Sequence, residues 1–389
     1  MISVEEALVR CLALAAPLPL ETVPLAQAAG RWMGVHAVAM RDQPPFPASA
    51  MDGYALRGDP ATGESFIVIG EAGAGHAFQG TVGPGQAVRI FTGAPAPEGA
   101  TRVVIQEDVA RDGDRITLTA GSDGSTNIRP LGQDFRRGDS LSPRRLRAND
   151  LALLAAMNIP TVQATCRPVV ALIATGDELV MPGEDPRPDQ IIASNSFALK
   201  AMVEAEGGEA RLLPIARDNE AELATVLGLA EGADLIVTIG GASVGDHDLV
   251  GKAAGLEHSF WKIAMRPGKP LMAGRLDGMP MLGLPGNPVS AIVCGHLFLL
   301  PMVRAMLGDP SPAPQTRRAR LAVNLPANGV RAHYMRARLT QGEEMPEIAP
   351  FDRQDSALLS ILGQADALLI RPVGDGPRGA GSTVDYLPL

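Results

Sequence analysis

The sequence predicts a multidomain protein of the α/β and β classes, built around a central three-layer α/β domain with a mostly parallel sheet. Its 389 residues exceed one ordinary hydrophobic core, and about one domain per 150 residues gives two to four domains. Apolar strand-like runs alternate with helical segments across residues 168–315, which is typical of βαβ units. Short β-like runs between glycines and prolines predict an inserted small β domain over 51–137 and a C-terminal β domain over 316–389. The remaining segments, 1–50 and 138–167, form the expected helical and extended N-terminal domain.

Composition narrows the class of protein. The formal net charge is −9 and aromatic residues are 4% of the chain, which argues against nucleic-acid binding by charge or by base stacking. Cys11, Cys166 and Cys294 are odd in number and far apart, which indicates reduced structural thiols. The N-terminus lacks a signal-peptide pattern, and we expect no run to reach the ~18 apolar residues that a membrane span needs. These observations predict a cytoplasmic protein without a nucleic-acid or membrane partner.

Helices are predicted in the N-terminal domain. Residues 2–15 carry apolar side chains at helical spacing after Ser3, and Glu6 is placed as its capping-box partner. A second, short helix is expected over 26–39, where it runs into an extended segment. A third is expected over 144–156, where the chain returns from the inserted domain.

Two polar residues of the inserted β domain are candidate site residues. The prolines before Asp52 force extended backbone and would hold its carboxylate in one place, although an ordinary turn aspartate is the alternative. Thr92, with Gly93, follows a strand and can present N–H and O–H donors to an anion, although such turns are common. The β-like runs of this domain are 66–69, 86–91, 100–106 and 115–119.

The central domain begins with a continuous apolar run at 169–174, the pattern of a strand covered on both faces. Strands and helices at this spacing predict a parallel sheet with functional loops at the carboxyl ends of its strands. Glu178, Asp218 and Asp248 fall at such ends. Each alone is more often a cap or a surface charge, but three acids at one edge favour a site for a hard cation such as Mg²⁺. The further elements expected are helices over 195–206, 220–230 and 289–307 and strands over 210–215, 233–237 and 279–284.

A glycine-rich loop at 238–248 follows one of these buried strands. Gly240, Gly241 and Gly245 expose backbone N–H groups that can approach an anion closely, and Ser243 adds a hydroxyl. Aspartates in the same loop would repel phosphate unless Mg²⁺ lay between them. The loop predicts a nucleotide or other phosphoester held with metal, against the alternative of a plain glycine-rich turn.

A compact group of cations follows the loop. Lys262 and Arg266 alternate onto one side of an expected edge strand, and Lys269 comes three residues later. An anionic ligand of a protein with net charge −9 needs such a local cluster, although a solvated basic edge strand is the alternative.

A second anion site is predicted where Pro285 ends a strand. Asn287 suits an N-cap and Pro288 the first helical position, so the next helix would point its N-terminus and Ser290 at the same edge. The C-terminal domain is expected to hold strands over 318–325, 333–339, 367–371 and 383–387, with Arg331, Arg336 and Arg338 on a solvated face.

Several motifs, taken together and in order, resemble the molybdopterin molybdenumtransferase family. They are Pro45-Phe-Pro-Ala-Ser-Ala-Met-Asp-Gly-Tyr54, Phe91-Thr-Gly-Ala-Pro95, Thr175-Gly-Asp-Glu178, Gly240-Gly-Ala-Ser-Val-Gly-Asp-His-Asp248, Arg266-Pro-Gly-Lys-Pro270 and Leu284-Pro-Gly-Asn-Pro-Val-Ser290. The resemblance runs from the N-terminal helix to the C-terminal β domain and is highly specific.

The resemblance implies an L-shaped homodimer of four-domain subunits. Such a protein takes adenylylated molybdopterin and molybdate, inserts molybdenum at the dithiolene with Mg²⁺ present, and releases AMP. It also implies a composite site, in which the cleft of one subunit faces the Asp52 loop of the other. The adenylyltransferase and apo-molybdoenzymes are implied as further partners.

The same resemblance assigns roles to residues. Active-site residues would be Asp52, Thr92, Glu178, Asp218 and Asp248, of which the last three would hold Mg²⁺. Lys262, Arg266 and Lys269 would bind the anion, and Pro285 and Pro288 would shape the cleft. Arg266 is a departure, because many members have lysine there. Arginine keeps the charge but offers a planar fork, so it would grip an oxyanion in a different geometry.

Two other functions stay open at this point. One is a molybdopterin adenylyltransferase, whose single domain resembles residues 168–310; the long N-terminal domains and the Asp52 loop argue against it. The other is a non-enzymatic scaffold or cofactor-binding module, as in the fused animal homologue gephyrin. The chain lacks a long linker or a fused partner domain, which argues against the second.

Overall fold

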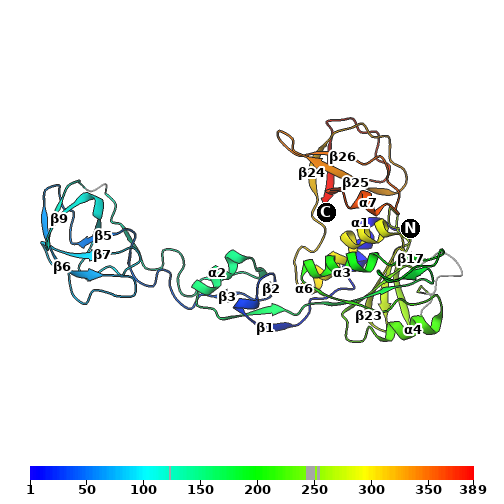
Figure 1. Ribbon diagram of the computed structural model, residues 1–389, viewed down its shortest axis with the longest axis horizontal. Coiled ribbons are helices and arrows are strands. Elements are labelled where there is room, and N and C mark those ends of the chain that lie inside the picture. Colours follow the sequence, from blue (N-terminus) through cyan, green and yellow to red (C-terminus); the bar gives the residue numbers. More distant parts are fainter. Residues whose placement is uncertain (122–123, 242–249, 252–254) are drawn as a thin grey trace. The chain divides into compact units, whose positions relative to one another are not determined.

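The computed structural model describes residues 1–121, 124–241, 250–251 and 255–389. The chain divides into two compact units, one made of Met1–Glu21 with Thr165–Leu389 and the other of Thr22–Ala164. Figure 1 labels the elements, and each unit contains its own clusters of buried hydrophobic residues.

One sheet contains the segments that enter and leave the unit 22–164. Its order is β1-β14-β2-β13. Helix α2 (Ala148–Ala156) packs Leu154 in one hydrophobic core with buried residues of this sheet. The strand bounds are Leu20–Pro24, Thr161–Thr165, Trp32–Met33 and Arg144–Arg145 in that order.

The prediction of a short helix over 26–39 is wrong. A 3₁₀ turn, η1 (Leu25–Gln27), forms there instead, and the chain continues as β2 and β3 (Ala37–Val38), which pair with β13 and β12 (Ser140–Leu141). Gly30 has φ +73°, a left-handed turn that helical backbone does not allow. Helix α2 begins at residue 148 instead of 144, because Arg144 and Arg145 form the strand β13.

The same unit contains a six-stranded sheet of order β8-β5-β7-β6-β10-β9. Its strands are β5 (Gly53–Leu56), β6 (Ser65–Ala72), β7 (Gln86–Ile90), β8 (Arg102–Ile105), β9 (Val109–Asp112) and β10 (Arg115–Leu118). The four runs expected in 66–119 fall on β6, β7, β8 and β10. Gly53 is required where β5 meets β8, because a Cβ there would lie 1.9 Å from the Val104 carbonyl oxygen. Separately, β4 (Ala48–Ser49) pairs with β11 (Ile128–Arg129).

The other unit contains a mixed sheet of order β18-β15-β19-β23-β22-β20. The first four strands are parallel, and β22 and β20 are antiparallel to their neighbours. The bounds are β15 (Val169–Ala174), β18 (Glu209–Leu212), β19 (Leu235–Ile239), β20 (Leu256–Trp261), β22 (Met272–Leu276) and β23 (Met279–Leu284). This confirms a mostly parallel sheet, and the continuous apolar runs of β15 and β23 match their predicted bounds.

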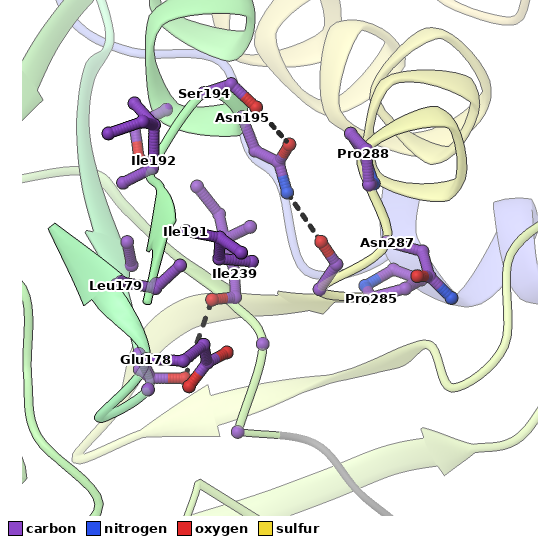
Figure 2. Close-up of a pocket in the computed structure, with 18 of the residues that line it drawn as sticks. Glu178, Leu179, Ile191, Ile192, Ser194, Asn195, Ile239, Pro285, Asn287 and Pro288 are labelled. Carbon is purple, nitrogen blue, oxygen red and sulfur yellow. Dashed lines mark hydrogen bonds between the residues drawn. The ribbon is translucent and has the colours of Figure 1, made fainter. Parts of the chain in front are cut away.

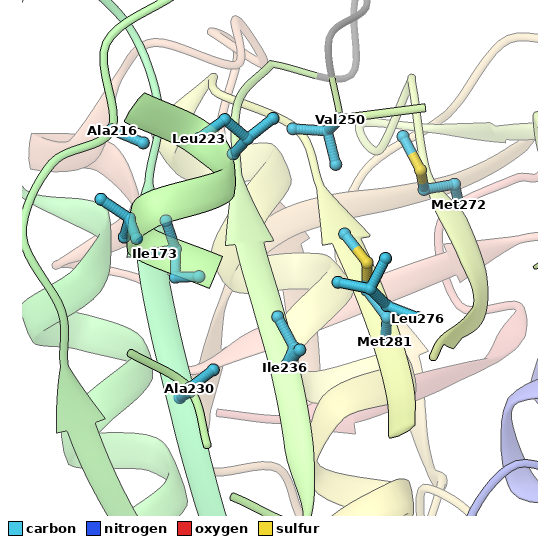
Figure 3. Packing of buried hydrophobic residues seen from close by; sticks show 11 residues of the cluster. Ile173, Ala216, Leu223, Ala230, Ile236, Val250, Met272, Leu276 and Met281 are labelled. Atoms are coloured by element: carbon cyan, nitrogen blue, oxygen red, sulfur yellow. The ribbon is translucent and has the colours of Figure 1, made fainter. Parts of the chain in front are cut away.

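Helices cover both faces of this sheet. Helix α4 (Glu220–Gly228) contributes Leu223 to a buried cluster on one face, to which the strands contribute Ile173 and Ile236 (Figure 3). Helix α3 (Asn195–Glu206) packs on β15 and β18 through buried residues outside that cluster, so it covers the opposite face. The arrangement is the expected three layers.

A long helix follows β23. It consists of α5 (Pro288–Cys294), a π-helical turn η3 (Gly295–Leu299) and α6 (Leu300–Leu307). With 20 residues it is long and apolar enough to cross a membrane, contrary to the expectation that no run would reach that length. Its most apolar window is 78% buried inside the protein, where it packs as a core helix.

Helix α1 (Val4–Leu12) belongs to the same unit. Ser3 Oγ accepts a hydrogen bond from the Glu6 N–H at 3.1 Å, as the capping pattern predicts, and Arg10 Nη1 donates to the Ser259 carbonyl at 2.7 Å. The helix packs on α6, β20 and β22. Residues 1–21 therefore join the α/β unit rather than the expected N-terminal domain.

The C-terminal strands form a sheet of order β21-β25-β26-β24-β28-β27, and β25 also pairs with β27, which closes five strands into a barrel. The bounds are β21 (Met265–Arg266), β24 (Arg317–Leu321), β25 (Ala332–Thr340), β26 (Glu347–Pro350), β27 (Ala367–Arg371) and β28 (Thr383–Pro388), with the short helix α7 (Leu359–Leu362) before β27. The four strands expected here are β24, β25, β27 and β28.

Arg336, expected on a solvated face of β25, is fully buried. Its Nη2 donates to the carbonyls of Arg353 and Asp355 at 3.4 and 3.0 Å, and in the described part of the chain its Nε and Nη1 have no hydrogen-bond partner. Burial lowers the pKa of the guanidinium. Met335 and Ala337 pack in the barrel core, so Arg336 lies on the opposite face of β25, where the segment of Arg353 and Asp355 covers it. Alternation along one strand does not reveal such a cover.

Removing the cap of α4 should destabilise the α/β unit. Asn219 Oδ1 accepts a hydrogen bond from the Glu222 N–H at 2.8 Å, so Asn219→Ala leaves a helix-end donor unpaired and is expected to cost about 1 kcal/mol of unfolding free energy. Urea unfolding in a Trp32→Phe background measures it, since Trp261 then reports on this unit alone. An unchanged midpoint would contradict the role of the cap.

Candidate functional site

A cavity of about 630 Å³ lies at the carboxyl ends of β15, β19 and β23, and we call it the main cavity (Figure 2). The loops after these strands and the segments that open α3 and α5 supply its walls. Six of the predicted site residues line it: Glu178, Asp218, Gly240, Gly241, Pro285 and Pro288. The structure thus brings together residues that are more than 100 positions apart in sequence.

Glu178 is positioned by the loop that follows β15. Its carboxylate folds back over Gly176, and the loop favours glycine at this position because the backbone there has φ +145°. Arg217 Nη1 donates to the carbonyls of Gly176, Asp177 and Leu179 at 3.4, 3.0 and 3.0 Å. Arg217 therefore holds the backbone on both sides of Glu178.

Glu178 and Asp218 are the two predicted metal ligands that the structure describes. The third, Asp248, lies outside the described residues, as do Ser243 and Gly245. Among the described residues, no group of three or more His, Cys, Asp or Glu side chains is placed to hold a metal ion. Two carboxylates on one cavity still suit Mg²⁺, which takes one or two carboxylates and completes its shell with water and phosphate oxygens.

Gly240 and Gly241 allow close packing of the backbone at the carboxyl edge of the sheet. Both have positive φ, at +89° and +63°, and a Cβ on them would lie 2.8 Å from the Thr175 carbonyl oxygen and 2.5 Å from Thr175 Oγ1, respectively. The Gly240 N–H donates to the Leu284 carbonyl at 3.0 Å, so it is not available to an anion as the sequence suggested. These glycines let three strand ends approach closely beneath the main cavity.

The helix that begins at Pro288 faces the main cavity with its first residues. Asn287 is the N-cap residue and Pro288 the first helical position, as predicted, but the Asn287 side chain makes no capping hydrogen bond. Asn195 Nδ2, at the start of α3, donates to the Gly286 carbonyl at 2.7 Å and ties the two helix entrances together (Figure 2).

A second cavity, of about 270 Å³, is lined by several cations, and we call it the basic cavity. Arg266, Lys269 and Ser290 line it as the sequence predicted, and Asn287 lines both this cavity and the main one. Further lining residues come from the C-terminal barrel and the segment after β26: Arg331, His333, Gln354 and Ser356. Two of the three cations predicted to bind an anion therefore line a cavity of their own, which shares Asn287 with the main cavity.

Lys262 is not among the residues that line either cavity. The expected alternation of Lys262 and Arg266 on one strand is wrong, because β20 ends at Trp261 and Arg266 belongs to β21, which pairs with β25 in the barrel. Lys262 has φ +82°, and its Nζ lies 5.4 Å from the centroid of the Trp261 ring.

His333 lines the basic cavity as an uncharged side chain. Burial, followed by the nearby charges of Arg266, Arg336, Arg371 and Arg331, lowers its pKa to about 3. The imidazole is therefore uncharged at neutral pH and can offer a hydrogen bond but no positive charge. The electrostatic attraction for an anion must come from the arginines and Lys269.

Asp52 and Thr92 meet in the unit 22–164. Asp52 Oδ1 accepts hydrogen bonds from the Thr92 N–H and from Thr92 Oγ1, both at 2.7 Å, so the two residues assigned together from sequence are direct partners. These two bonds, with a smaller contribution from the charge of Arg89, lower the pKa of Asp52. A cavity of about 720 Å³ lies beside this pair, lined by Gly93, with Arg41, Arg129 and Asp134 among the other lining residues.

Removing one of these bonds should raise the pKa of Asp52. In Thr92→Val the N–H donor remains and the hydroxyl is lost, so we expect the pKa of Asp52 to rise and the carboxylate to stay ionised over a narrower pH range. An NMR titration of the carboxyl carbon measures the pKa. Thr101→Val is the matched control, because Thr101 Oγ1 accepts from the Gly58 N–H and does not contact Asp52. Equal effects of the two substitutions would contradict the assignment.

Several site residues were missed from sequence. Arg217 lies after a strand and Asn195 begins a helix. Both positions fall at the carboxyl edge of the sheet, so they could have been predicted together with Glu178 and Asp218. Arg331, expected on a solvated face, is half-buried and lines the basic cavity. His333 and Ser356 lie in or after barrel strands, where no local pattern indicated a site.

A parallel sheet with carboxylates and close-packed glycines at its carboxyl edge, beside a basic cavity, is the arrangement of an α/β protein with a ligand site at the ends of its strands. Family models match the MoeA N-terminal region (domain I and II) over residues 2–158, a probable molybdopterin binding domain over 171–305 and the MoeA C-terminal region (domain IV) over 318–389. The chain belongs to the MoeA family, which confirms the resemblance found in its motifs.

Individual relatives agree with the family match. The chain is 34% identical to a molybdopterin molybdenumtransferase of Haemophilus influenzae, covering 96% of this chain and 95% of the relative. It is 36% identical to molybdopterin molybdenumtransferase 2 of Mycobacterium tuberculosis, with 95% of both chains covered. A crystal structure of molybdopterin biosynthesis MoeA protein from Pyrococcus horikoshii superposes with a TM-score of 0.86 at 27% identity, covering 100% of both chains.

Proposed function

We propose that this chain catalyses molybdenum insertion into adenylylated molybdopterin, with molybdate as the source of the metal and AMP as a product. The observation that carries the proposal is the pair of compartments that share Asn287, one with carboxylates and one with cations. A nucleotide-bearing substrate and a small oxyanion can be held side by side there, so proximity supplies much of the rate. The relatives that match this chain are named molybdopterin molybdenumtransferases, which supports the proposal.

The basic cavity suits molybdate by size and charge. Arg266, Lys269 and Arg331 can surround a tetrahedral dianion, and Ser290 and Ser356 line the same cavity. The main cavity would take the adenylylated pterin. Glu178 and Asp218, with Asp248, would hold Mg²⁺, which would supply charge neutralisation at the phosphoanhydride. No residue of the chain needs to act as a nucleophile.

Asp52 and Thr92 complete the proposal as the second half of a composite site. In a two-fold homodimer, the main cavity of one subunit would work with the Asp52 loop of its partner, giving two equivalent sites. The protein would act in the cytoplasm, in contact with the adenylyltransferase and the apo-molybdoenzymes.

The test is incubation of the protein with adenylylated molybdopterin, molybdate and Mg²⁺, followed by measurement of AMP and reconstitution of a cofactor-free molybdoenzyme. We expect AMP release that depends on molybdate, and active enzyme. ATP-dependent adenylylation of molybdopterin would instead identify an adenylyltransferase, and tight binding without turnover would identify a scaffold.

Neutralising the described carboxylates should weaken the use of metal. Glu178→Gln and Asp218→Asn are each expected to raise the Mg²⁺ concentration for half-maximal AMP release by more than about tenfold, since outer-shell partners of a metal are already worth 10–100-fold. Glu204→Gln is the control, because Glu204 pairs with Lys200 on α3 and does not line the main cavity. An unchanged Mg²⁺ dependence in both variants would contradict the assignment.

A further inference from the structure

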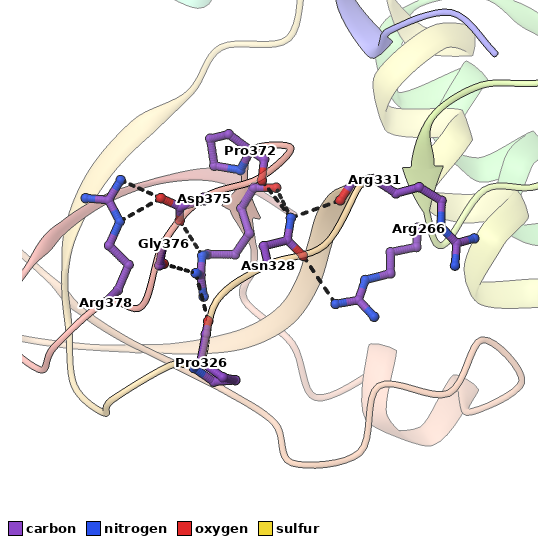
Figure 4. A network of polar contacts seen from close by, with 9 residues as sticks. Arg266, Pro326, Asn328, Arg331, Pro372, Asp375, Gly376 and Arg378 are labelled. Atoms are coloured by element: carbon purple, nitrogen blue, oxygen red, sulfur yellow. Dashed lines mark hydrogen bonds and ion pairs between the residues drawn. The ribbon is translucent and has the colours of Figure 1, made fainter.

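Asn328, in the segment between β24 and β25, joins the barrel to the basic cavity. Its Nδ2 donates to the carbonyls of Arg331, Arg371 and Pro372 at 2.9, 3.1 and 2.6 Å (Figure 4). Its Oδ1 accepts a hydrogen bond from Arg266 Nη2 at 3.3 Å. One half-buried amide therefore contacts two residues of the basic cavity, Arg266 and Arg331.

The orientation of this amide is determined by its surroundings. The group facing the carbonyls of Arg331, Arg371 and Pro372 must be the NH₂, because a carbonyl oxygen there would face other acceptors. Oδ1 is then turned toward Arg266, which needs an acceptor. The orientation follows from the hydrogen-bond network itself.

The anchor of the amide is rigid. Arg371 is 3% exposed, and its side chain donates to Asp375 Oδ2 at 2.5 Å and to the carbonyls of Pro326 and Gly376 at 3.0 and 2.7 Å. Asp375 also accepts from Arg378. This buried network fixes the strand end whose carbonyls hold Asn328 (Figure 4).

The partner of Arg266 is neutral. Among the residues that the structure describes, its guanidinium bonds to the Asn328 amide and to no carboxylate. An amide can orient a guanidinium without cancelling its charge, whereas an aspartate or glutamate would cancel it. The planar fork of arginine has five N–H donors, so Nη2 can bond to Asn328 while the other donors remain for an anion.

From this geometry we infer that Asn328 is a positioning residue, which orients the Arg266 guanidinium toward an oxyanion in the basic cavity. The inference rests on the proposed function, in which that cavity takes molybdate. Arginine suits this role better than lysine would, because an ammonium group cannot present the planar fork that bonds to Asn328 and to the anion in one fixed geometry. Asn328 and Arg266 thus form one functional pair.

The experiment measures the Kd of molybdate alone by isothermal titration calorimetry, in the full chain and without pterin. The variants are Arg266→Met, Arg266→Lys, Asn328→Ala and the double variant Arg266→Lys with Asn328→Ala. Asn324→Ala is the matched control, because Asn324 Oδ1 accepts from the Ala380 N–H at 2.8 Å in the same barrel and Asn324 does not line the basic cavity.

We expect Asn328→Ala to raise the Kd by on the order of tenfold, the loss typical of one hydrogen bond to a charged group. In the Arg266→Lys background the same substitution should change the Kd by less than about twofold, since the fork that Asn328 orients is absent. Asn324→Ala should leave the Kd unchanged. A purely structural role of Asn328 would weaken binding equally in both backgrounds, which would overturn the inference.

The outcomes also separate this inference from the proposed function. If the wild-type chain binds no molybdate, or if Arg266→Met leaves the Kd unchanged, the assignment of the basic cavity fails and the inference fails with it. If Arg266→Met weakens binding and Asn328→Ala does not, the cavity assignment stands and only the role of Asn328 is wrong.

Discussion

Replacing Arg266 and Lys269 together by methionine is expected to raise the molybdate concentration for half-maximal turnover by roughly a hundredfold, since each charge-assisted hydrogen bond to an anion contributes about 1.5 kcal/mol or more. The net charge of the chain is −9, so no general field compensates for the loss of these two local cations. The affinity for adenylylated molybdopterin should change far less, because the main cavity is intact. The measurement is AMP release as a function of molybdate at saturating pterin substrate.

The chain offers a matched control for this experiment. Lys262 lies in the same segment and was assigned to the same role from sequence, but its Nζ lies near the Trp261 ring and it lines neither cavity. Lys262→Met should therefore leave the molybdate requirement within about twofold of the wild type. If it raises the requirement as much as the double variant does, the basic cavity is not the anion site.

Mixed dimers should reveal whether each active site contains residues of one subunit or of both. We expect inactive Asp52→Ala and Glu178→Ala chains to recover about half of the wild-type activity per heterodimer, because one of the two composite sites then contains both native residues. The measurement is AMP release by heterodimers purified with two affinity tags. The reason for the expectation is the proposed homodimer, in which Asp52 of one chain serves the main cavity of the other.

A reciprocal mixture provides the control. A chain that carries both substitutions, paired with a wild-type chain, should be inactive if the site is composite, since each site then lacks one of the two residues. If each site is built within one chain, the opposite results are expected. The heterodimer of the doubly substituted and wild-type chains then has half activity, and the heterodimer of the two singly substituted chains has none. The two mixtures together leave no ambiguous result.

Local sequence patterns determined much of the fold. The bounds of β15, β23, β27 and α3 match their predictions, because each is a continuous apolar run or a periodic segment bounded by glycine or proline. The family also follows from motifs, since each is a short stretch whose residue types can be compared directly. The carboxylates at the sheet edge were predictable for a related reason: parallel strands all present their carboxyl ends to one edge, where Glu178 and Asp218 do line one cavity.

Tertiary structure alone decided the rest. Arg336 is buried because the segment of residues 353–355 covers the face of β25 that is turned away from the barrel core. Lys262 and Arg266 separate because Lys262 follows the last strand of the α/β sheet, whereas Arg266 belongs to β21, which pairs with the barrel strand β25. Asp52 and Thr92 meet across 40 positions of sequence, and Asn328 reaches Arg266 across 62. In each case the neighbour that sets the role of a side chain arrives from a distant segment, so the periodicity of its own segment carries no information about that contact.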